Sequence, residues 1–340
     1  MSVHLKDIAA YTGVSIKTVS NVVNGNYARV GPETREVILD AIKKLNYQPN
    51  VAARHLRKAQ VGVLAYAFPD LANPYFADIG NAIVSAGAEH DYTVFLDYTF
   101  SERDKELHVV KGLRPHLIDG VILDSHALEI EDISPEEVRG PIVLLGERLF
   151  GAPFDHVLID NVAAAHSATQ HLISLGRRRI AAIGVQQCQS EAPSLRLQGF
   201  TQALDEAGIA VDPALLVDGG FWHRADGAAA TRELLALDNP PDAIFCFNDL
   251  MALGALSVLH EAGCRIPEEI ALIGIDDIED GRYSSPALST IAPDKAAIAG
   301  IAVSLLIDRI KGKRTQAPEC INAPFHLCAR ASTLGRGSST

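Results

Sequence analysis

The chain has 340 residues, a formal net charge of −12, 48% hydrophobic residues and 21% charged residues. This composition excludes an intrinsically disordered chain and is rich enough in apolar side chains for a large buried core. The length fits one small domain together with a body of two domains of ordinary size.

The charge is divided unevenly along the chain. Residues 1–60 contain nine lysines and arginines against four aspartates and glutamates, a net charge of +5, which leaves −17 for the remainder. A basic segment on an acidic body is typical of phosphate attraction confined to one end. Small helical domains can also be basic by chance, so the charge alone does not establish DNA binding. The sequence motifs are needed to predict it.

The lack of apolar segments and the pattern of cysteines indicate the cellular compartment. Lys6 and Asp7 stand where the apolar run of a signal peptide would have to build, and the longest apolar stretch, residues 296–307, is too short to span a bilayer. The cysteines are odd in number and form no C-x-x-C pair; they are Cys188, Cys246, Cys264, Cys320 and Cys328. We therefore expect a cytoplasmic protein with buried free thiols, no zinc site and no membrane segment.

The N-terminal run LKDIAAYTGVSIKTVSNVVNG predicts two short helices joined by a tight turn. Gly13 can adopt the left-handed backbone of such a turn, and Ser15 can cap the second helix. A shared small core is predicted for Ile8, Ala9, Val14, Val19 and Val22. The opposite face of the second helix carries Ile16, Lys17, Ser20 and Asn21. Such a face suits the major groove of DNA.

A third helix is predicted from Pro32, which suits the first helical position, and Pro49 ends it. Its buried stripe is expected to consist of Val37, Ile38, Ala41, Ile42 and Leu45. The following segment, NVAARHLR from Asn50, is long enough for one or two helical turns. So short a helix is marginal in water, so we expect it to order only when DNA or a twin chain holds it; a plain linker is the alternative.

From Val61 onward, short apolar runs alternate with amphipathic helical patterns. The apolar runs are VGVLAYAF, TVFLDY, DGVIL, PIVLL, RIAAIGV, DAIFCF and IALIGI. Helical patterns run from Pro74 to His90, from Glu102, over residues 195–207 and from Asp249 to Ala262. This alternation predicts parallel sheets covered by helices, and its restart near Arg179 predicts two similar lobes. Ligands of such lobes bind at the carboxyl ends of the strands, here in the cleft between lobes.

The head, the segment NVAARHLR and the body motifs GVLAYAFPDLANPYFADI, GERLFGAPFDHVLIDN, RLQGF, FNDLMALGA and IGIDD together resemble the lactose-repressor (LacI/GalR) family of bacterial transcription regulators. The resemblance covers residues 3–334. It implies an all-α helix-turn-helix head at 1–48, a hinge helix at 49–59, and a two-lobed α/β body of the periplasmic-binding-protein type at 60–331. Lobe 1 would comprise about 60–160 and 292–322, lobe 2 about 161–291 and 323–331, and residues 332–340 would form a tail.

The resemblance also implies roles for residues of the head and hinge. The base-reading positions are Ile16, Lys17 and Asn21, of which Asn21 contacts either a base edge or a phosphate. The DNA-backbone positions are Thr18, Ser20, Asn24, Thr34, Tyr47 and Asn50. Leu56, with Ala53, matches the wedge that family members insert into the minor groove, although a buried or dimer-contact leucine is the alternative.

For the effector, the residues that match the pocket of the family are Tyr75, Phe76, Glu147, Arg196, Trp222, Asn248 and Asp276. Aromatic faces can hold a sugar ring or a purine, and the arginine, asparagine and aspartate suit hydroxyl groups. Ordinary packing is the alternative for Trp222, and both Glu147 and Asp160 could be structural. Adjacent carboxylates at Asp276 and Asp277 point oppositely on a strand end, so we expect no metal there.

We find no catalytic or cofactor motif, so we expect neither an enzyme nor a cofactor. The expected function is a ligand-responsive transcription regulator, a repressor that binds a pseudo-palindromic double-stranded DNA operator as a homodimer. The absence of a leucine-heptad tail favours a dimer over a tetramer. A sugar or sugar derivative is the first candidate for the effector and a nucleoside or purine the second. A solute-binding protein or an enzyme with a regulatory head are the rival classes.

Overall fold

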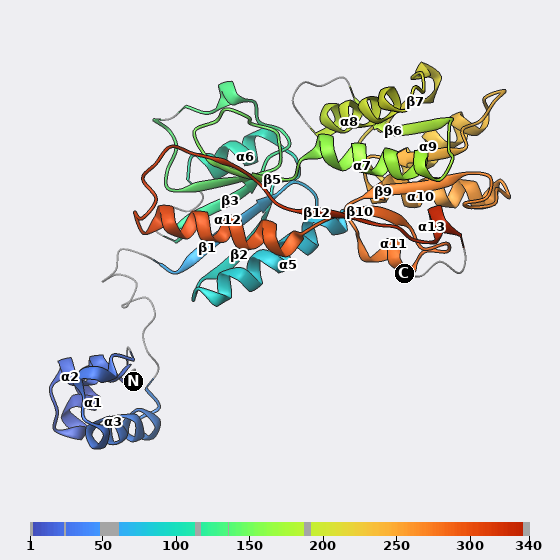
Figure 1. Ribbon diagram of the computed structural model, residues 1–340. Helices are drawn as coiled ribbons and strands as arrows, with labels where there is room; N and C mark the ends of the chain where they lie inside the picture. Colours follow the sequence, from blue (N-terminus) through green and yellow to red (C-terminus); the bar gives the residue numbers. More distant parts are fainter. Residues whose placement is uncertain are drawn as a thin grey trace. The chain divides into compact units, whose positions relative to one another are not determined.

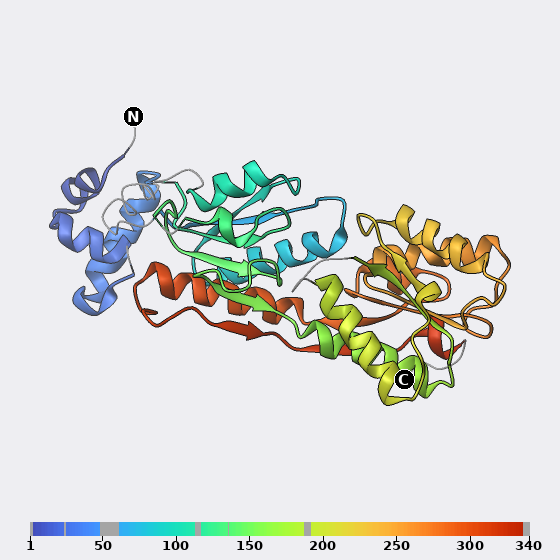
Figure 2. The same ribbon diagram turned by 90° about the horizontal axis from the view of Figure 1, so that it is seen from above.

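The computed structural model describes residues 3–23, 25–47, 61–112, 117–134, 136–186 and 192–335. The chain divides into two compact units, Met1–Val61 and Gly62–Thr340, and each is described by itself. Figure 1 shows the elements of both units, and Figure 2 shows them from a second direction.

The first unit, the head, is a three-helix domain. Its helices are α1 (Leu5–Thr12), α2 (Ile16–Val23) and α3 (Pro32–Lys44), with a short 3-10 helix η1 (Tyr27–Arg29) before α3. Gly13 ends α1 with φ of +70°, and the backbone N–H of Thr18 donates to Oγ of Ser15 at 3.1 Å, which caps α2 as predicted. Buried side chains from all three helices, including Ile8, Val19 and Ile38, form one small core.

One residue that was predicted to belong to the buried stripe of α3 is exposed in the structure. Ile38 and Ala41 are buried, whereas Val37 is 52% exposed. At about 100° per residue, Ile38, Ala41, Ile42 and Leu45 share one stripe toward the core, and Val37 lies at its margin, where its side chain faces outward. The prediction for Val37 was therefore wrong.

The first lobe of the body is built on a six-stranded sheet with the order β11-β5-β4-β3-β1-β2. All its strand pairs are parallel. The strands are β1 (Val63–Phe68), β2 (Thr93–Tyr98), β3 (Gly120–Asp124), β4 (Ile142–Leu145), β5 (Asp155–Leu158) and β11 (Cys320–Asn322). The helices are α5 (Pro74–Glu89), α6 (Arg103–Val110), η2 (Ile130–Asp132) and α12 (Lys295–Ile310).

The second lobe repeats this plan with a second six-stranded sheet, of order β12-β10-β9-β8-β6-β7, in which only β12 runs antiparallel to its neighbour. The strands are β6 (Ile180–Val185), β7 (Leu216–Asp218), β8 (Ala243–Cys246), β9 (Ala271–Ile275), β10 (Ser289–Pro293) and β12 (Phe325–Cys328). The helices are α7 (Asn161–Ser174), α8 (Ala192–Glu206), η3 (Pro213–Leu215), α9 (Arg224–Leu235), α10 (Asp249–Glu261), α11 (Glu279–Tyr283) and α13 (Ala331–Leu334). The predicted α/β body of two lobes is confirmed.

The chain passes between the lobes three times, from β5 to α7, from β10 to α12 and from β11 to β12. The long helix α12 belongs to the first lobe, where it packs on α5 and on the sheet, although it follows a strand of the second lobe (Figure 2). Central strands β3, β4, β8 and β9 are buried along their whole length because helices cover both faces of the sheets.

Two expectations need correction. Of the four described cysteines only Cys246 is fully buried, and Cys320 is exposed because it lies on the edge strand β11. The segment predicted as tail from residue 332 continues as helix α13, with Ser332 and Thr333 buried against β9 and β10. Within the described residues, we find no helix whose length and apolar content would suffice to cross a membrane.

Candidate functional site

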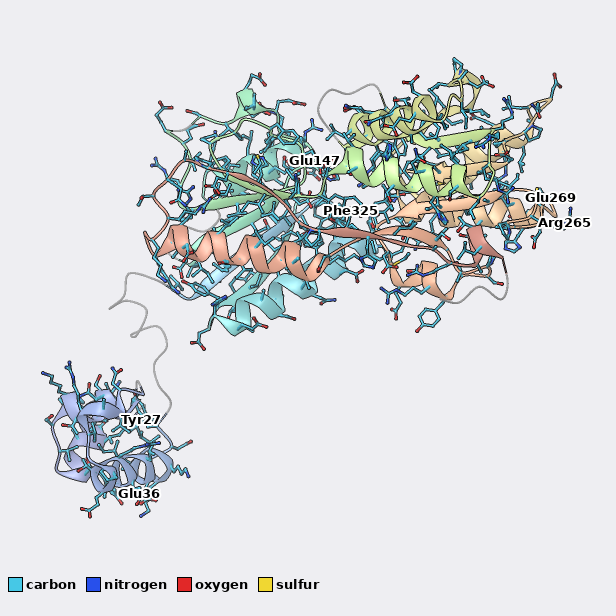
Figure 3. The ribbon with its side chains drawn as sticks, viewed as in Figure 1. Tyr27, Glu36, Glu147, Arg265, Glu269 and Phe325 are labelled. Atoms are coloured by element: carbon cyan, nitrogen blue, oxygen red, sulfur yellow. The ribbon has the colours of Figure 1, made fainter. Side chains whose placement is uncertain are left out.

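A cavity of about 750 Å³ lies in the cleft between the two lobes of the body. It is bordered by the carboxyl ends of strands from both sheets, which is where ligands of doubly wound sheets bind. The residues predicted for the effector all line it; they are Tyr75, Phe76, Glu147, Arg196, Trp222, Asn248 and Asp276. Figure 3 marks Glu147 on the side of the first lobe that faces the second.

Arg196 is the central cation of the cavity. It lies on α8 and is buried, and its Nε donates to Oδ1 of Asn161 at 2.7 Å while its Nη1 donates to the carbonyl of Phe247. The guanidinium carbon lies 5.3 Å from the centre of the Trp222 ring. These contacts hold the guanidinium in one orientation against an aromatic face, which suits directional recognition of ligand oxygens.

Trp222 is positioned by an unusual backbone and by two contacts. Its φ is +64°, its indole Nε1 donates to the carbonyl of Gly184 at 3.2 Å, and its ring meets Phe247 edge-on. The amide of Asn248 supports the same loop, because its Nδ2 donates to the carbonyl of Trp222 at 2.9 Å. Its Oδ1 accepts the backbone N–H of Met251 and caps α10. Asn248 thus borders the cavity with both ends of its amide already engaged by protein.

Asp276 follows β9 and is buried with φ of +120°. Burial raises the pKa of Asp276, and the positive charges of Arg196 and Lys295 act against that rise. Its neighbour Asp277 faces elsewhere and pairs with Arg282 and Arg330, both at 2.5 Å. Asp276 therefore offers its carboxylate to the cavity, while Asp277 stabilises the strand end.

Aromatic side chains form the wall contributed by the first lobe. Tyr75 and Phe76 lie in the first turn of α5, after the cap Asn73, whose Oδ1 accepts the backbone N–H of Tyr75. Tyr98 at the end of β2 stacks on Phe100 with ring centres 3.7 Å apart. The cavity thus has flat apolar faces on both sides, from Phe76 and Phe100 in one lobe and Trp222 in the other.

The first lobe also brings two buried carboxylates to the cavity. Asp124 ends β3 and Glu147 follows β4. Burial raises the pKa of Asp124 well above its ordinary value, and the carboxylates of Glu147 and Glu106 raise it further. Burial also raises the pKa of Glu147 to about 7, against the lowering effects of Arg196 and Asn161.

Sequence reasoning missed several residues of this site, among them the aromatic Phe100 and the polar Asn161 and Asp124. Asn161 donates from Nδ2 to Glu147 and accepts from Arg196, and so connects the two lobes across the cleft. Asp124 stands at a strand end, and that signal could have identified it. Asn161 gave no comparable signal, because it opens a helix where the neighbouring Asp160 is the visible cap. The side chain of Asp160 is exposed and accepts the backbone N–H of Ala163.

In the head, α2 presents the predicted DNA-reading face. Ile16 and Lys17 are exposed, and Ser20 and Asn21 are half-buried at its margin. Thr18 shares a hydrogen bond of 2.8 Å with Ser15, and Thr34 and Tyr47 are half-buried. The predictions for Asn24, Asn50, Ala53 and Leu56, and for the hinge at 49–59, lie outside the described residues.

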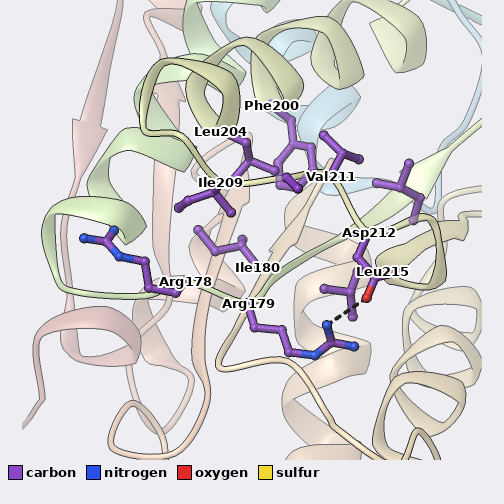
Figure 4. A pocket seen from close by; sticks show the side chains of 11 residues that line it. Arg178, Arg179, Ile180, Phe200, Leu204, Ile209, Val211, Asp212 and Leu215 are labelled. Atoms are coloured by element: carbon purple, nitrogen blue, oxygen red, sulfur yellow. Dashed lines mark hydrogen bonds and ion pairs between the residues drawn. The ribbon is translucent and has the colours of Figure 1, made fainter.

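A second, smaller cavity of about 150 Å³ lies away from the cleft, at the start of β6 (Figure 4). Its wall is mostly aliphatic, with Phe200 and Leu204 from α8. Nη1 of Arg179 pairs with Asp212 at 2.7 Å, so this arginine is already neutralised. The small volume and apolar lining make it a packing defect of the lobe rather than a ligand site.

Known proteins match this chain over nearly its whole length. Residues 4–50 match bacterial regulatory proteins of the lacI family, and residues 169–333 match the periplasmic binding protein-like domain. The HTH-type transcriptional repressor PurR of Mannheimia succiniciproducens is 34% identical over 313 residues, which cover 91% of this chain and 92% of that protein.

Two solved structures are similar in fold as well. The lac repressor dimer bound to operator and the anti-inducer ONPF is 28% identical, with a TM-score of 0.82 over 98% of this chain and 100% of that one. The complex of the transcriptional regulator CelR with cellobiose is 33% identical, with a TM-score of 0.70 over 97% of this chain and 99% of that one.

A helix-turn-helix head and a two-lobed body with a ligand cavity define an effector-responsive, DNA-binding transcription regulator. The chain belongs to the lacI family of bacterial regulatory proteins, because PurR shares a third of its residues over nine-tenths of both chains.

Proposed function

We propose that this protein is a cytoplasmic repressor whose affinity for its operator is set by a sugar-like effector in the cleft, and that it acts by binding and not by catalysis. The observation that carries the proposal is the convergence of Arg196, Asp276 and Trp222 on one cavity. An arginine and an aspartate match ligand hydroxyl groups, and the indole face matches the apolar side of a sugar ring. The similar CelR structure contains cellobiose, which supports a sugar for this chain.

On the DNA side, α2 enters the major groove and presents Ile16, Lys17 and Asn21 to base edges. Thr18, Ser20, Thr34 and Tyr47 position the head on the phosphates. Asn24 and Asn50 add backbone contacts, and Leu56 with Ala53 opens the minor groove at the centre of the site. The exposed ammonium of Lys17 forms no ion pair with a described residue, which leaves it available to a guanine edge.

The protein acts as a homodimer on a pseudo-palindromic site. The edge strand β2 exposes Phe95 and Leu96 on its two faces, and Val84 on α5, which packs against β2, is exposed as well. Large apolar side chains gathered at an uncovered sheet edge favour a second copy as the partner. The similar lac repressor structure is a dimer on operator DNA.

The effector acts by changing how the lobes meet. Asn161 already joins Glu147 of the first lobe to Arg196 of the second, and His223 of the second lobe approaches Asp70 of the first at 3.8 Å. A ligand that binds one arrangement of these groups better than another shifts the population of that arrangement. The coupling to DNA is then worth about 1–3 kcal/mol, as is typical of allosteric pairs.

The test is a thermal-shift screen of the full chain against sugars and nucleosides, since a cleft ligand raises Tm by mass action. For a sugar that raises Tm, Asp276→Asn should remove the shift and the effect on operator binding but leave operator binding itself intact. Asp280→Asn is the matched control, because Asp280 is half-exposed on α11 and pairs only peripherally with Arg224. An unaltered ligand response in Asp276→Asn would contradict the assignment of the cavity.

A nucleoside or purine is the second candidate. Flat aromatic faces from Phe76 and Phe100 on one side and Trp222 on the other could enclose a base as well as a sugar ring. A nucleoside that raises Tm in the same screen, where no sugar does, would select this alternative.

A further inference from the structure

The cavity wall holds more buried carboxyl groups than buried cationic groups. The carboxylates of Asp124, Glu147 and Asp276 are all buried at its wall, whereas Arg196 is the only buried cation among its described lining residues. A buried carboxylate without a counter-charge is costly, so burial raises the pKa of Asp124 and of Glu147, and a cation placed beside them would favour their charged forms. The distribution of charge therefore carries information about the ligand.

The single buried cation, Arg196, donates hydrogen bonds to residues of the second lobe. Its Nε donates to Asn161 and its Nη1 donates to the carbonyl of Phe247. The guanidinium also lies near Glu147, Asp276 and Trp222. The other arginine at the cavity, Arg148, donates its Nε to the carbonyl of Leu128 at 2.7 Å and pairs with Glu129 at 2.5 Å. Neither guanidinium pairs with Asp124.

Asp124 is the least compensated of the three carboxylates. It is 7% exposed, borders the cavity, and accepts no hydrogen bond from another described residue. Its nearest basic group is Nε2 of His126, at 3.6 Å from Oδ1. Desolvation lowers the pKa of His126 to about 4, so the ring is neutral at pH 7 and supplies no positive charge.

The nearby carboxylate of Glu106, in contrast, is buried with hydrogen-bond donors from the same lobe. Glu106 is fully buried, and it accepts hydrogen bonds from the hydroxyl of Ser125 and from the backbone N–H groups of His126, Ala127 and Leu128. Four donors satisfy this carboxylate inside the lobe. Asp124, one residue before this loop, has no such set and faces the cavity instead.

We propose that the effector is an amino sugar, whose protonated amine lies between Asp124 and Glu147 while its hydroxyl groups meet Arg196 and Asp276. A charge-assisted hydrogen bond from an ammonium to a desolvated carboxylate is stronger than one from a neutral hydroxyl. The amine supplies the counter-charge that the first lobe lacks, and the aromatic walls hold the ring. This inference rests on the cleft being the effector site, as proposed above.

The volume of the cavity guides the choice of probes. About 750 Å³ accommodates a disaccharide, so three disaccharides with one β-1,4-glucose backbone form a matched set. They are cellobiose, with hydroxyl groups only, the glucosamine dimer, with protonated amines, and diacetylchitobiose, whose acetylated nitrogens are neutral. Glucosamine, galactosamine and mannosamine, each beside its parent hexose, extend the set to single rings.

Calorimetric titration of the full chain with these compounds tests the proposal. At least one amine should bind ten or more times tighter than every neutral counterpart in its set, which is the hydroxyl compound and, for the disaccharides, the N-acetyl compound as well. In Asp124→Asn the affinity for that amine should fall at least tenfold, while the affinity for the neutral counterpart stays within about twofold. Asp104→Asn, whose side chain is 96% exposed on α6, is the matched control and should change neither affinity.

Glu147→Gln provides a second variant if Asp124→Asn does not fold, and it should show the same loss for the amine. Equal or weaker binding of every amine relative to its neutral counterpart would overturn the proposal, as would failure of every amino sugar to bind. An equal loss for charged and neutral ligands in Asp124→Asn would overturn it too. A neutral sugar that binds and alters operator affinity would overturn only this inference, whereas an amine that binds without altering operator affinity would overturn only the effector role.

Discussion

At the scale of single residues, the polar groups of the cleft hold one another in place. Asn161 accepts from Arg196 and donates to Glu147, and Asn248 supports the Trp222 loop while it caps α10. Side chains whose hydrogen bonds are already made keep one orientation, which lowers the entropic cost of binding a ligand. The groups that we propose for ligand contact are the carboxylates of Asp124, Glu147 and Asp276, the guanidinium of Arg196 and the indole face of Trp222.

The head allows a direct test at this scale. Lys17→Ala should weaken binding to the selected operator by about 1–3 kcal/mol, because a base-edge contact is lost. Binding to a scrambled duplex should change much less. Fluorescence anisotropy with both duplexes measures the two effects.

Lys43→Ala removes the same charge from the last turn of α3, where no base contact is proposed, and is the control for Lys17→Ala. It should weaken both duplexes by similar, small factors. If Lys17→Ala also lowers the affinities for operator and scrambled DNA equally, Lys17 contacts phosphate and the base-reading role is wrong.

Residue predictions from the sequence were most effective at strand ends. Asp276 follows the apolar run IALIGI, and the carboxyl ends of parallel strands meet in the cleft, so its position there could be predicted. The position of Trp222 was predicted from the resemblance to the family. Asn161 and the pairing of Arg148 with Glu129 depend on contacts across long separations in the chain, which no local pattern encodes. For the same reason, the hydrogen bond from Asn248 to the carbonyl of Trp222 could not be predicted from the sequence.

At the scale of elements, glycines set how closely helices pack in the second lobe. A Cβ at Gly254 of α10 would lie 1.9 Å from the carbonyl oxygen of Arg224, and one at Gly227 of α9 would lie 2.1 Å from that of Met251. A Cβ at Gly199 of α8 would lie 2.1 Å from the carbonyl oxygen of Val162. These helix pairs therefore meet backbone to backbone, and α10 carries Asn248 at its start.

Gly254→Ala should lower the free energy of unfolding of the body by about 1–3 kcal/mol, since backbone atoms cannot yield as a flexible side chain can. Gly300 is the matched control, because it is also helical, on α12, and an added Cβ there meets nothing within 4 Å. Gly300→Ala should raise stability by about 0.5–1 kcal/mol. Urea denaturation followed by circular dichroism measures both, and equal midpoints for the two variants would contradict the packing argument.

The apolar runs identified β1, β2, β3, β4, β6, β8 and β9, and the helical patterns identified α5, α6, α8 and α10. The inner strands β5 and β10 and the helices α7, α9 and α12 were not among these predictions. The edge strands β11 and β12 were not predicted either, because their burial patterns are mixed and pairing with a neighbour, not apolar content, defines them. Strand β12 also runs antiparallel, which local sequence does not reveal.

At the scale of the whole molecule, the body is two lobes joined by three chain crossings around one cavity. Such connections allow the lobes to change their mutual angle while each sheet stays intact. The net charge is +5 in the first 60 residues and −17 in the rest of the chain. Attraction to phosphate is therefore confined to the head. We therefore assign DNA affinity to the head and the control of that affinity to the body.

The most direct test of this coupling is an anisotropy titration of the full chain against its operator, first obtained by selection from random duplexes, with and without a saturating cleft ligand. Operator affinity should change about 5- to 150-fold with ligand, which corresponds to a coupling of about 1–3 kcal/mol. The selected duplex should be an inverted repeat. Identical operator affinity at zero and saturating ligand, with ligand binding demonstrated in the same sample, would contradict the account.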